Sequence, residues 1–549
     1  MFPTSTSPAS RQLVGNLGHA RGRTIASSLG PAVASISCHH VSHSTLSVGR
    51  INGVGRTYST RLIHSSTNRP KPTDHLTIEN ASSLPATGGP QSSEMPKTPG
   101  PSPLAVLPLT NVLRSWMTTT VSSSPFLLPP SLAAMSVLAH TTNPVLNPDR
   151  NPLLRAFLKK TFYAQFCAGE NPAEVRQTID SLKQIGFSGV ILGYAREVVL
   201  SDSETKDLAS CAADGGAAAE ECIRTEINPW AEGTMETVRL ASPGDFVALK
   251  FTGAGRQALY CLSKQLPPSE ALGSAIDGIC KLAAERGVRL LFDAEQTALQ
   301  PGIDDWTLDY MRRYNKSDSG NAVVYGTYQA YLKSTPATLS KHLAIAATEG
   351  FSLGVKLVRG AYLGSDPRQL ICDTKADTDS QYDGIAEALL RKSWSGPLQP
   401  PAPGSAEKET TFPDVNVVLA THNRESVLKG KALLDSGVAK LGYEQVAFAQ
   451  LQGMADEVSC ELVAGPHETP KEMEMAEKQS GKDSEKGSEL VNKPQVYKYL
   501  VWGSTGECMK YLLRRAYENR DAVQRTRSGR EAMGREFRRR VKGLFGVSS

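Results

Sequence analysis

The stretch Val415-Asn-Val-Val-Leu-Ala420, with residues 425–434 shortly after it, shows one unit of the fold. The first six residues are short, β-branched and apolar, which favours a buried strand, whereas residues 425–434 have the pattern of a helix, as have residues 336–349. The other strand candidates lie at residues 189–193, 246–251, 288–293, 322–326, 354–358, 445–450 and, with a weaker pattern, 496–501. Most of them are followed by a helical stretch. Eight strands that alternate with helices predict an α/β fold of the (β/α)8 barrel type.

The rest of the chain divides around this barrel, which we expect at residues 186–525. Residues 106–185 are predicted to form an N-terminal helical segment, and 74–105, rich in Ser, Thr and Pro, a disordered linker. Three stretches, 201–244, 395–411 and 465–493, interrupt the barrel rhythm and are expected to be surface loops, the last one disordered. Residues 115–147 carry no charged side chain, but four prolines break them, so a packed helix pair is favoured over a membrane span, with a peripheral membrane contact as the alternative.

The charge of the chain is unevenly distributed. The formal net charge is +5, yet residues 1–73 contain eight Lys and Arg and no Asp or Glu, so the remainder is at −3. A mildly acidic body does not indicate a nucleic-acid-binding protein. An Arg-, Ser- and Thr-rich segment without acids is typical of a mitochondrial presequence, which we therefore expect at residues 1–73.

Cysteine, histidine and motif patterns exclude several kinds of site. The nine cysteines are an odd number and form no CxxC pair, which favours reduced, buried thiols and gives no sign of a zinc site or of any other metal. The sequence has no GxGxxG after a strand, no P-loop and no GxSxG elbow. Rossmann-type nucleotide binding, ATP binding and serine-hydrolase chemistry are therefore not supported.

A helix near the C-terminus carries the most informative charges. In residues 507–519, the apolar side chains of Met509, Leu512, Leu513 and Ala516 recur at helical spacing and indicate one packed face. Arg514 and Arg515 lie beside that face, with Glu518 within one turn. Two adjacent guanidinium groups suit a small carboxylate, held by paired hydrogen bonds, although a solvated charged helix face is the simpler alternative.

Polar residues also gather where the predicted strands end. In a barrel of this kind functional groups lie at the C-terminal ends of the strands, so we expect these side chains to share one mouth. Together they would suit an anionic cofactor. They are Lys250, Asp293, Glu295, Gln329, Lys356, Arg359, Tyr362, Thr421, His422, Asn423, Gln450, Gln452 and Tyr499.

Six segments carry a resemblance to a known family. They are residues 292–297 (FDAEQT), 327–333 (TYQAYLK), 356–363 (KLVRGAYL), 420–423 (ATHN), 450–454 (QLQGM) and 511–519 (YLLRRAYEN). In this order and spacing the chain resembles the proline dehydrogenases, also called proline oxidases, which are FAD-dependent mitochondrial enzymes. The loop organisation and the basic leader are similar to the fungal form.

The resemblance implies a distorted (β/α)8 barrel with FAD bound non-covalently at the strand ends. It implies that Arg514, Arg515 and Lys250 hold the carboxylate of L-proline, oriented by Glu518. Glu197 would gate the site. The same resemblance assigns Tyr362, Leu451, Tyr499 and Tyr511 to the walls of the substrate site, Asp293 to its hydrogen-bond network, and Gln329, Lys356, Arg359, Gly360, Thr421, His422, Asn423 and Gln450 to FAD. One departure is Lys356, where bacterial members have Arg.

The implied reaction transfers a hydride from C5 of L-proline to flavin N5 and gives Δ1-pyrroline-5-carboxylate, with electrons passed to membrane ubiquinone on the matrix side of the inner mitochondrial membrane. The basic tail, residues 526–549, would be either an amphipathic helix on that membrane or an ordinary solvated helix. Three rivals stay open: a hydroxyproline dehydrogenase, disfavoured by the bulk of Tyr499; a folate-reducing flavoprotein; and a non-catalytic barrel that binds or regulates.

Overall fold

The computed structural model describes residues 102–195, 216–316, 320–400, 411–465, 493–518 and 523–545, without the side chains of residues 518 and 523–525. The predicted presequence, Glu197, the side chain of Glu518 and almost all of the third predicted insertion lie outside the described residues.

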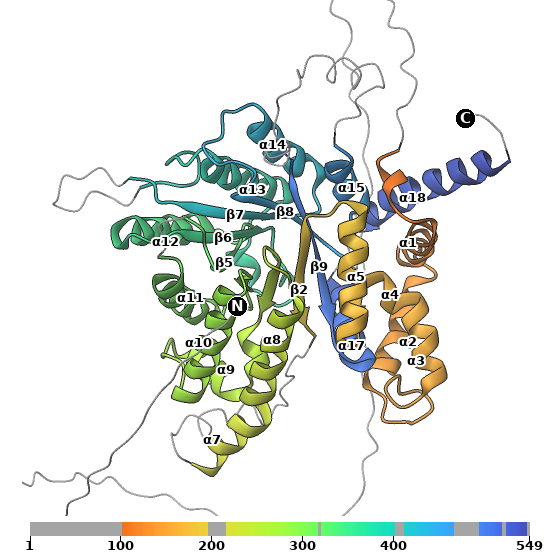
Figure 1. Cartoon of the computed structure of the whole chain (residues 1–549), viewed down its shortest axis with the longest axis horizontal. Coiled ribbons are helices and arrows are strands. Elements are labelled where there is room, and N and C mark those ends of the chain that lie inside the picture. The colour runs from red at the N-terminus through yellow and green to blue at the C-terminus, as the bar shows by residue number, and fades with distance from the viewer. Residues whose placement is uncertain are drawn as a thin grey trace, which may run out of the picture. The chain divides into compact units, whose positions relative to one another are not determined.

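Eight parallel strands form a closed barrel (Figure 1). Each strand pairs with the next along the chain, and the last pairs with both its predecessor and the first, so the ring closes. A short additional strand, β1 (Cys167–Gly169), pairs with β9 outside the ring. The barrel strands are β2 (Gly189–Tyr194), β3 (Phe246–Leu249), β4 (Arg289–Phe292), β5 (Val324–Gln329), β6 (Leu353–Val358), β7 (Val415–Ala420), β8 (Val446–Leu451) and β9 (Gln495–Trp502). This confirms the predicted fold class and all eight predicted strands, including the weakest.

Helices follow the strands and surround the barrel (Figure 1). Those within the barrel sequence are α7 (Ala217–Cys222), α8 (Asn228–Leu240), α9 (Arg256–Ser263), α10 (Glu270–Glu285), α11 (Gln300–Tyr314), α12 (Thr335–Glu349), α13 (Lys375–Leu390), α14 (Arg424–Asp435), α15 (Asp456–Ala464) and α17 (Thr505–Glu518). Before the barrel come α1 (Leu109–Ser122), α2 (Leu128–His140), α3 (Pro152–Leu158), α4 (Ala164–Phe166) and α5 (Pro172–Ile185), and the chain ends with α18 (Val523–Leu544). Short helical turns are η1 (Pro103–Val106), η2 (Lys159–Tyr163), η4 (Ile223–Ile227), η5 (Phe251–Ala254) and η6 (Arg368–Leu370).

The alternation of side chains along the strands divides the core into two clusters. One fills the barrel and includes Ile191, Phe246, Leu291 and Val418. The larger one lies between the strands and the surrounding helices. Because side chains alternate with a period of two, the inward series of four strands, β3 to β6, reach polar residues at or near their C-terminal ends, namely Lys250, Asp293, Gln329 and Lys356. This arrangement brings the polar strand ends to one mouth.

The prediction that residues 201–244 form a surface loop is wrong for the second half of this stretch. Residues 217–240 are helical, and α8 buries Trp230 and Val238 against the barrel. Because α8 follows β2, it belongs to the barrel rhythm as the helix of the first strand-helix unit. Its Gly- and Ala-rich approach concealed the helical spacing.

Two further boundaries need correction. The predicted linker ends before residue 105, because Pro103–Val106 forms a helical turn with Leu104 buried. In the predicted insertion 395–411, Leu398 is fully buried, so its beginning packs on the domain.

The N-terminal helices and the C-terminal helices pack on one another. The predicted helix pair exists as α1 and α2, with α1 beside α18 and α2 beside α17. Trp116 of α1 stacks on Phe537 of α18, with ring centroids 5.9 Å apart, and Met533 is buried in the same contact. The start of the predicted tail is therefore a packed helix. None of the helices in the described ranges has the length and hydropathy to cross a membrane.

Candidate active site

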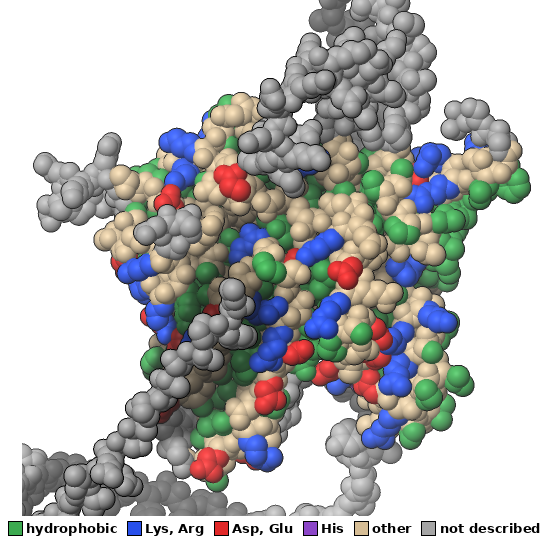
Figure 2. Space-filling view, in the orientation of Figure 1, with side chains coloured by type: hydrophobic (Ala, Val, Ile, Leu, Met, Phe, Trp, Pro, Cys, Tyr) green, Lys and Arg blue, Asp and Glu red, His purple; other side chains and the backbone are tan. Residues whose placement is uncertain are grey.

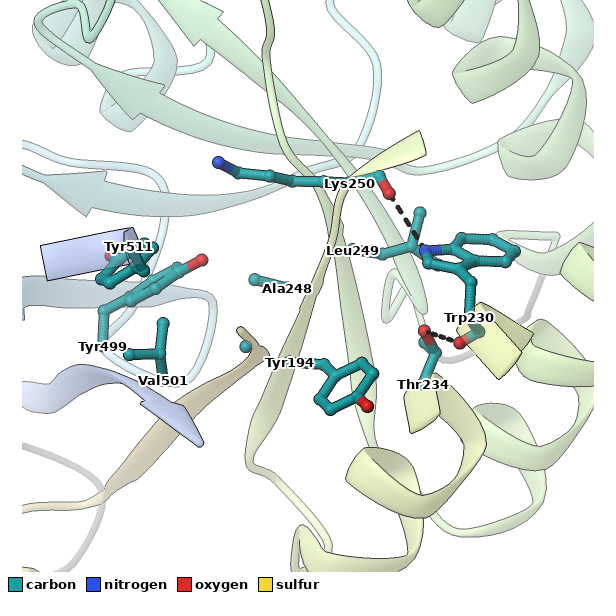
Figure 3. A pocket seen from close by; sticks show the side chains of 10 residues that line it. Tyr194, Trp230, Thr234, Ala248, Leu249, Lys250, Tyr499, Val501 and Tyr511 are labelled. Atoms are coloured by element: carbon teal, nitrogen blue, oxygen red, sulfur yellow. Dashed lines mark hydrogen bonds between the residues drawn. The ribbon is translucent and has the colours of Figure 1, made fainter. Parts of the chain in front are cut away.

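A pocket opens at the C-terminal ends of the barrel strands, beside β2, β3 and β9. Its lining includes Lys250, Tyr499 and Tyr511, together with Tyr194 and Trp230 (Figure 3). In Figure 3 the side chain of Lys250 extends toward the side where Tyr499 and Tyr511 lie, and Trp230 lies on the opposite side. The indole of Trp230 donates a hydrogen bond to the backbone carbonyl of Lys250 at 3.1 Å, which fixes the backbone from which the lysine side chain extends. The predicted residues Lys250, Tyr499 and Tyr511 thus meet around one pocket.

A buried ion pair stands at the base of this mouth. Lys356 of β6 and Asp293, which follows β4, are both nearly inaccessible, and Lys356 Nζ lies 2.5 Å from Asp293 Oδ1. The other carboxylate oxygen accepts a hydrogen bond from the Tyr499 hydroxyl at 3.2 Å. The Lys356 ammonium also lies 5.3 Å from the centroid of the Tyr499 ring. Asp293 therefore fixes one cation and one aromatic ring at once.

Helix α17 brings its two arginines to the same mouth. Its apolar face is buried as expected, with Met509 and Leu513 against α2. Arg515 Nε donates to the Tyr511 hydroxyl at 3.3 Å, and the guanidinium carbons of Arg514 and Arg515 lie 5.8 and 5.4 Å from the Tyr511 ring centroid. Tyr511 thus joins the arginine pair to the pocket.

The charges at the mouth act on two tyrosines. Burial raises the pKa of the Tyr362 hydroxyl, and Glu295 raises it further, whereas Arg514 and Arg515 oppose the shift. Burial also raises the pKa of Tyr499 far above its ordinary value, with Asp293 adding to the effect and Arg515 opposing it. Both tyrosines therefore stay neutral hydrogen-bonding groups at physiological pH. Both also lie close enough to the arginines of α17 for these charges to act on their pKa values.

Glu295 and Gln329 tie the rim loops together. The buried Glu295 carboxylate accepts hydrogen bonds from the backbone N–H and the hydroxyl of Thr252. Burial raises the pKa of Glu295, and the nearby Lys250 opposes that shift. The Gln329 amide donates to the Glu295 carbonyl at 3.4 Å and accepts from the Ala361 N–H at 3.0 Å. The loops after β3, β4, β5 and β6 are thereby connected, which holds their side chains in place.

Gly360 allows a close approach between two of these loops. Its φ of +150° is unusual for residues with a side chain, and a Cβ at this position would lie 2.4 Å from the ring of Tyr331. The Tyr331 hydroxyl donates to Asp366 at 2.6 Å and accepts from the Tyr362 N–H at 3.3 Å. The missing side chain at Gly360 therefore lets Tyr331 support Tyr362.

Arg359, Thr421 and His422 form the opposite part of the rim. Arg359 Nε donates to the Thr421 hydroxyl at 3.0 Å, and its guanidinium also contacts Asp379 and Ser426. His422 Nε2 accepts from the Leu451 N–H at 3.1 Å, which places the proton of the neutral ring on Nδ1. These contacts fix the cation and the imidazole at the ends of β6 and β7.

Comparison with known proteins identifies the family. The family model for proline dehydrogenase matches residues 175–528. The chain belongs to the proline dehydrogenase family. It is 30% identical to the probable mitochondrial proline dehydrogenase of Schizosaccharomyces pombe, over 79% of this chain and 89% of that protein. The barrel is accordingly that of an oxidoreductase.

Two other similarities add context to the family. The chain is 28% identical to the hydroxyproline dehydrogenase of Mus musculus, over 71% of this chain and 83% of that protein. Among solved structures it resembles proline utilization A from Bdellovibrio bacteriovorus, inactivated by N-propargylglycine, with a TM-score of 0.50, 16% identity and 76% of this chain covered. The chain spans 41% of that longer protein, so this likeness concerns the fold.

Two residues that the family resemblance assigned to FAD have another place in the structure. Gln450 is 2% exposed, and its amide donates to the Thr421 carbonyl and accepts from the Ser459 hydroxyl on α15. On β8 the inward series is Ala447, Ala449 and Leu451, so Gln450 faces outward behind the strand. The Asn423 side chain accepts from the N–H groups of Glu425 and Ser426 as the N-cap of α14. We therefore give neither side chain a cofactor role.

The sequence prediction missed Tyr194, Trp230 and Thr234 in the pocket lining. The last two belong to α8, in the stretch taken for a loop. The signal was present, because Ile227, Trp230, Ala231, Thr234 and Val238 recur at helical spacing and all five are buried.

The barrel interior fits a bound polar cofactor. The inward positions Gly193 and Ala248 are small, which leaves space beside Tyr499. The buried Thr327 hydroxyl, inward on β5 and paired in register with Lys356, has no hydrogen-bond partner among the described residues. A buried hydroxyl of this kind is normally satisfied, so it suits a polar group held at the mouth. Within the described ranges no group of three or more His, Cys, Asp or Glu side chains could hold a metal ion.

Proposed function

We propose that this protein binds FAD at the barrel mouth and oxidises L-proline to Δ1-pyrroline-5-carboxylate. The observation that carries the proposal is the meeting of Arg514 and Arg515 with Tyr511, next to the pocket of Lys250 and Tyr499. A cyclic amino acid has one carboxylate and one apolar ring. The mouth offers cations for the first and aromatic walls for the second.

The arginine pair is proposed to hold the substrate carboxylate. Guanidinium groups form paired hydrogen bonds to carboxylates, and these charge-assisted bonds are about twice as strong as neutral ones. Lys250 supplies a third positive charge from β3. Glu518 and Glu197 remain proposed as orienting and gating carboxylates for this cluster.

The aromatic residues are proposed to orient the ring of L-proline. The Tyr499 hydroxyl is held by Asp293, and the Tyr362 backbone N–H is held by the Tyr331 hydroxyl, so the Tyr499 ring and the backbone that carries Tyr362 have fixed positions. Tyr511 and Leu451 complete the walls. A substrate fixed at its carboxylate and along its ring presents C5 in one orientation, and such positioning contributes a large part of a rate enhancement.

FAD would be held by side chains on the rim and inside the barrel. Gln329, Lys356, Arg359, Thr421 and His422 offer donors and charge for its polar atoms, and Gly360 allows a close backbone approach. When bound, FAD accepts the hydride that leaves C5 while the nitrogen loses its proton and the C=N bond forms. The buried cation of Lys356 lies where it favours negative charge within the barrel.

The two electrons removed from L-proline are proposed to reach a membrane quinone. This function would place the protein on the matrix side of the inner mitochondrial membrane, in peripheral contact with the lipid. Its relatives from S. pombe and Dictyostelium discoideum are named mitochondrial. The acid-free leader of residues 1–73 supports the same location.

Hydroxyproline dehydrogenase activity is the second candidate, because one of the relatives carries that name. Tyr499 disfavours it. Its partly buried ring lines the pocket and its hydroxyl donates to Asp293, so we expect the bulk of this ring to occupy space that a hydroxyl on the substrate ring would need.

The substrates can be compared by steady-state turnover with a water-soluble dye as electron acceptor. We expect kcat/KM for L-proline to exceed that for trans-4-hydroxy-L-proline, and the cyclic imine product to be trapped by o-aminobenzaldehyde. Tyr499→Ser should narrow the preference. A preference of the unmodified protein for hydroxyproline would overturn the substrate assignment.

A further inference from the structure

Exposed apolar side chains are concentrated in one part of the molecule. Thirteen of the eighteen large hydrophobic side chains that are exposed in the described part lie between residues 109 and 157 or at residues 544–545. These segments are α1, α2, α3 with their connections, and the end of α18. We call this set the exposed apolar surface. Monomeric proteins rarely expose so many large apolar groups without a partner.

The stripe along α1 shows a regular pattern. Leu109, Leu113, Met117 and Val121 are 43%, 38%, 57% and 36% exposed and recur every four residues, so they follow one side of the helix. Another side of α1, with Val112, packs against α18. The helix is therefore apolar on two sides, and the fold uses only one of them.

The connections and α3 extend this surface. The turn between α1 and α2 presents Phe126, 86% exposed, and Leu127, 47% exposed. On α3, Leu153 and Phe157 are four residues apart and 82% and 63% exposed. Aromatic and aliphatic side chains at helix turns are suited to insertion into the boundary between lipid headgroups and acyl chains.

The charge around the exposed apolar surface is positive. Residues 102–157 contain three arginines and a single acid, the exposed Asp149. On α18, Arg535, Arg538 and Lys542 are exposed, whereas Glu536 is buried and bonded to Arg539 and Arg540. Figure 2 shows hydrophobic and basic side chains beside one another over α2, α3 and the far end of α18.

We infer that the exposed apolar surface docks the protein onto an anionic lipid membrane. Apolar groups enter the acyl boundary while the basic groups of α18 meet lipid phosphates. A second copy of the chain would suit the surface less well, because it would bring two basic α18 helices together. The contact lies in the plane of the membrane, since no described helix could span it. This inference deepens the proposed function, because it says where a protein that reduces a membrane quinone meets the membrane.

Vesicle binding of the full-length, FAD-loaded protein tests this inference. The probes are phosphatidylcholine vesicles with and without phosphatidylglycerol, assayed by co-sedimentation. We expect binding to the anionic vesicles, weakened about tenfold or more in Met117→Gln/Phe126→Ser, since both side chains would lose their apolar contact. Arg538→Gln/Lys542→Gln should weaken binding to the vesicles that contain phosphatidylglycerol and leave binding to pure phosphatidylcholine vesicles unchanged. The matched controls, Leu266→Gln/Val438→Gln and Lys264→Gln/Lys281→Gln, should bind as the unmodified protein does.

Activity separates this inference from the proposed function. Met117→Gln/Phe126→Ser should oxidise L-proline normally with a soluble dye but lose turnover with quinone embedded in vesicles. Unchanged vesicle binding in this variant would overturn the inference. The inference would also be overturned if the unmodified protein did not bind vesicles and instead dimerised through these residues. If the unmodified protein did not oxidise L-proline with the soluble dye, the proposed function would be contradicted, whereas the result on vesicle binding would be unaffected.

Discussion

Tyr499 joins the two groups of charges in the site. Its hydroxyl donates to Asp293, its ring lies over Lys356, and Arg515 is close enough to influence its pKa. Because this neutral phenol lies between the Lys356–Asp293 ion pair and Arg515, a movement of either group would shift the tyrosine and so affect the other. The proposed substrate binding therefore depends on the charges of Asp293, Lys356 and Arg515 around this one phenol.

Replacement of Arg515 by Met should remove one half of the carboxylate clamp. A hydrogen bond to a charged group contributes about 1.5–3 kcal/mol, so we expect the KM for L-proline to rise roughly 10- to 100-fold. Bound FAD should be retained, which an absorption spectrum of the variant checks. The matched control is Arg312→Met, because this partly exposed arginine of α11 pairs with Glu349 of α12, away from the mouth; it should leave KM unchanged. An unaltered KM in Arg515→Met would refute the clamp.

Replacement of Asp293 by Ala should destabilise the barrel. The change leaves Lys356 buried without its partner, and breaking one side of a buried pair costs about 3–5 kcal/mol in the free energy of unfolding. Tyr499→Phe removes only one hydrogen bond of the same carboxylate and should cost about 1 kcal/mol. Urea denaturation of both variants in the same cofactor state measures the difference. Equal costs would mean that the Lys356–Asp293 pair is not buried as described.

The sequence was informative wherever a residue type alone restricts the chemistry. Adjacent arginines beside an apolar helix face, and polar residues at strand ends, pointed to the mouth that the structure shows. The assignment of Gln450 to FAD did not take account of strand register, since a shift of one residue moves a side chain to the other face, and in the structure Gln450 bonds to Thr421 and Ser459. Asn423 was ambiguous for another reason, since the same amide can bind a ligand or cap a helix.

Among the connections between secondary-structure elements, the one after β6 positions part of the proposed substrate site. It carries Gly360 and Tyr362 and is tied to Gln329 and Tyr331 of the preceding unit. The strands were predictable because buried parallel strands read as short apolar runs. Helix α8 was not, because its apolar spacing follows an approach rich in Gly, Ala and Glu that resembles a loop. Local composition competed there with periodicity, and tertiary packing decided the outcome.

Replacement of Gly360 by Ala should disturb this connection. The new Cβ would meet the Tyr331 ring at 2.4 Å, so either the loop or the ring must move, and the KM for L-proline should rise with a loss of stability. Gly350→Ala is the matched control, because φ is +70° and a Cβ would meet nothing within 4 Å. It should cost about 1 kcal/mol through backbone strain alone and leave KM unchanged. Identical behaviour of the two variants would show that the contact with Tyr331 does not position Tyr362.

In the whole molecule, helices from the two ends of the described chain pack on one another beside the barrel. Helix α1 packs on α18, and α2 packs on α17, the helix that carries the arginine pair. The N-terminal helices therefore support the helix that carries the proposed substrate-binding arginines, and they also present the exposed apolar surface. The sequence predicted a packed helix pair before the barrel and a helix with one packed face at residues 507–519, but which helix packs on which depends on contacts between residues far apart along the chain.

The stability of the whole fold should fall on acidification, in part through His342. Burial lowers the pKa of this histidine to about 4 from an ordinary 6.5, and its Nδ1 lies 2.9 Å from the Tyr328 hydroxyl. The unfolded chain binds the proton more tightly, so the stability that the neutral ring provides is present above pH 6.5 and is lost as the pH falls toward 4. Between pH 7 and 5 this histidine should account for about 2 kcal/mol of lost stability.

Denaturant unfolding at pH 7 and pH 5 measures the contribution of His342. His342→Gln keeps a hydrogen-bonding group but cannot titrate, so the difference between the two pH values should shrink by about that amount. His140→Gln, at an exposed histidine, should retain the full difference. The same pH dependence in all three proteins would contradict the burial of a neutral His342.

We propose that one mouth binds both FAD and L-proline and lets them react. The most direct measurement is the visible absorption spectrum of the purified protein without oxygen, before and after addition of L-proline. We predict a flavin spectrum that bleaches with L-proline, and that bleaches in Arg515→Met only at much higher concentrations of it. A protein that cannot be reconstituted with FAD, or whose bound flavin is unaffected by L-proline, would contradict the account.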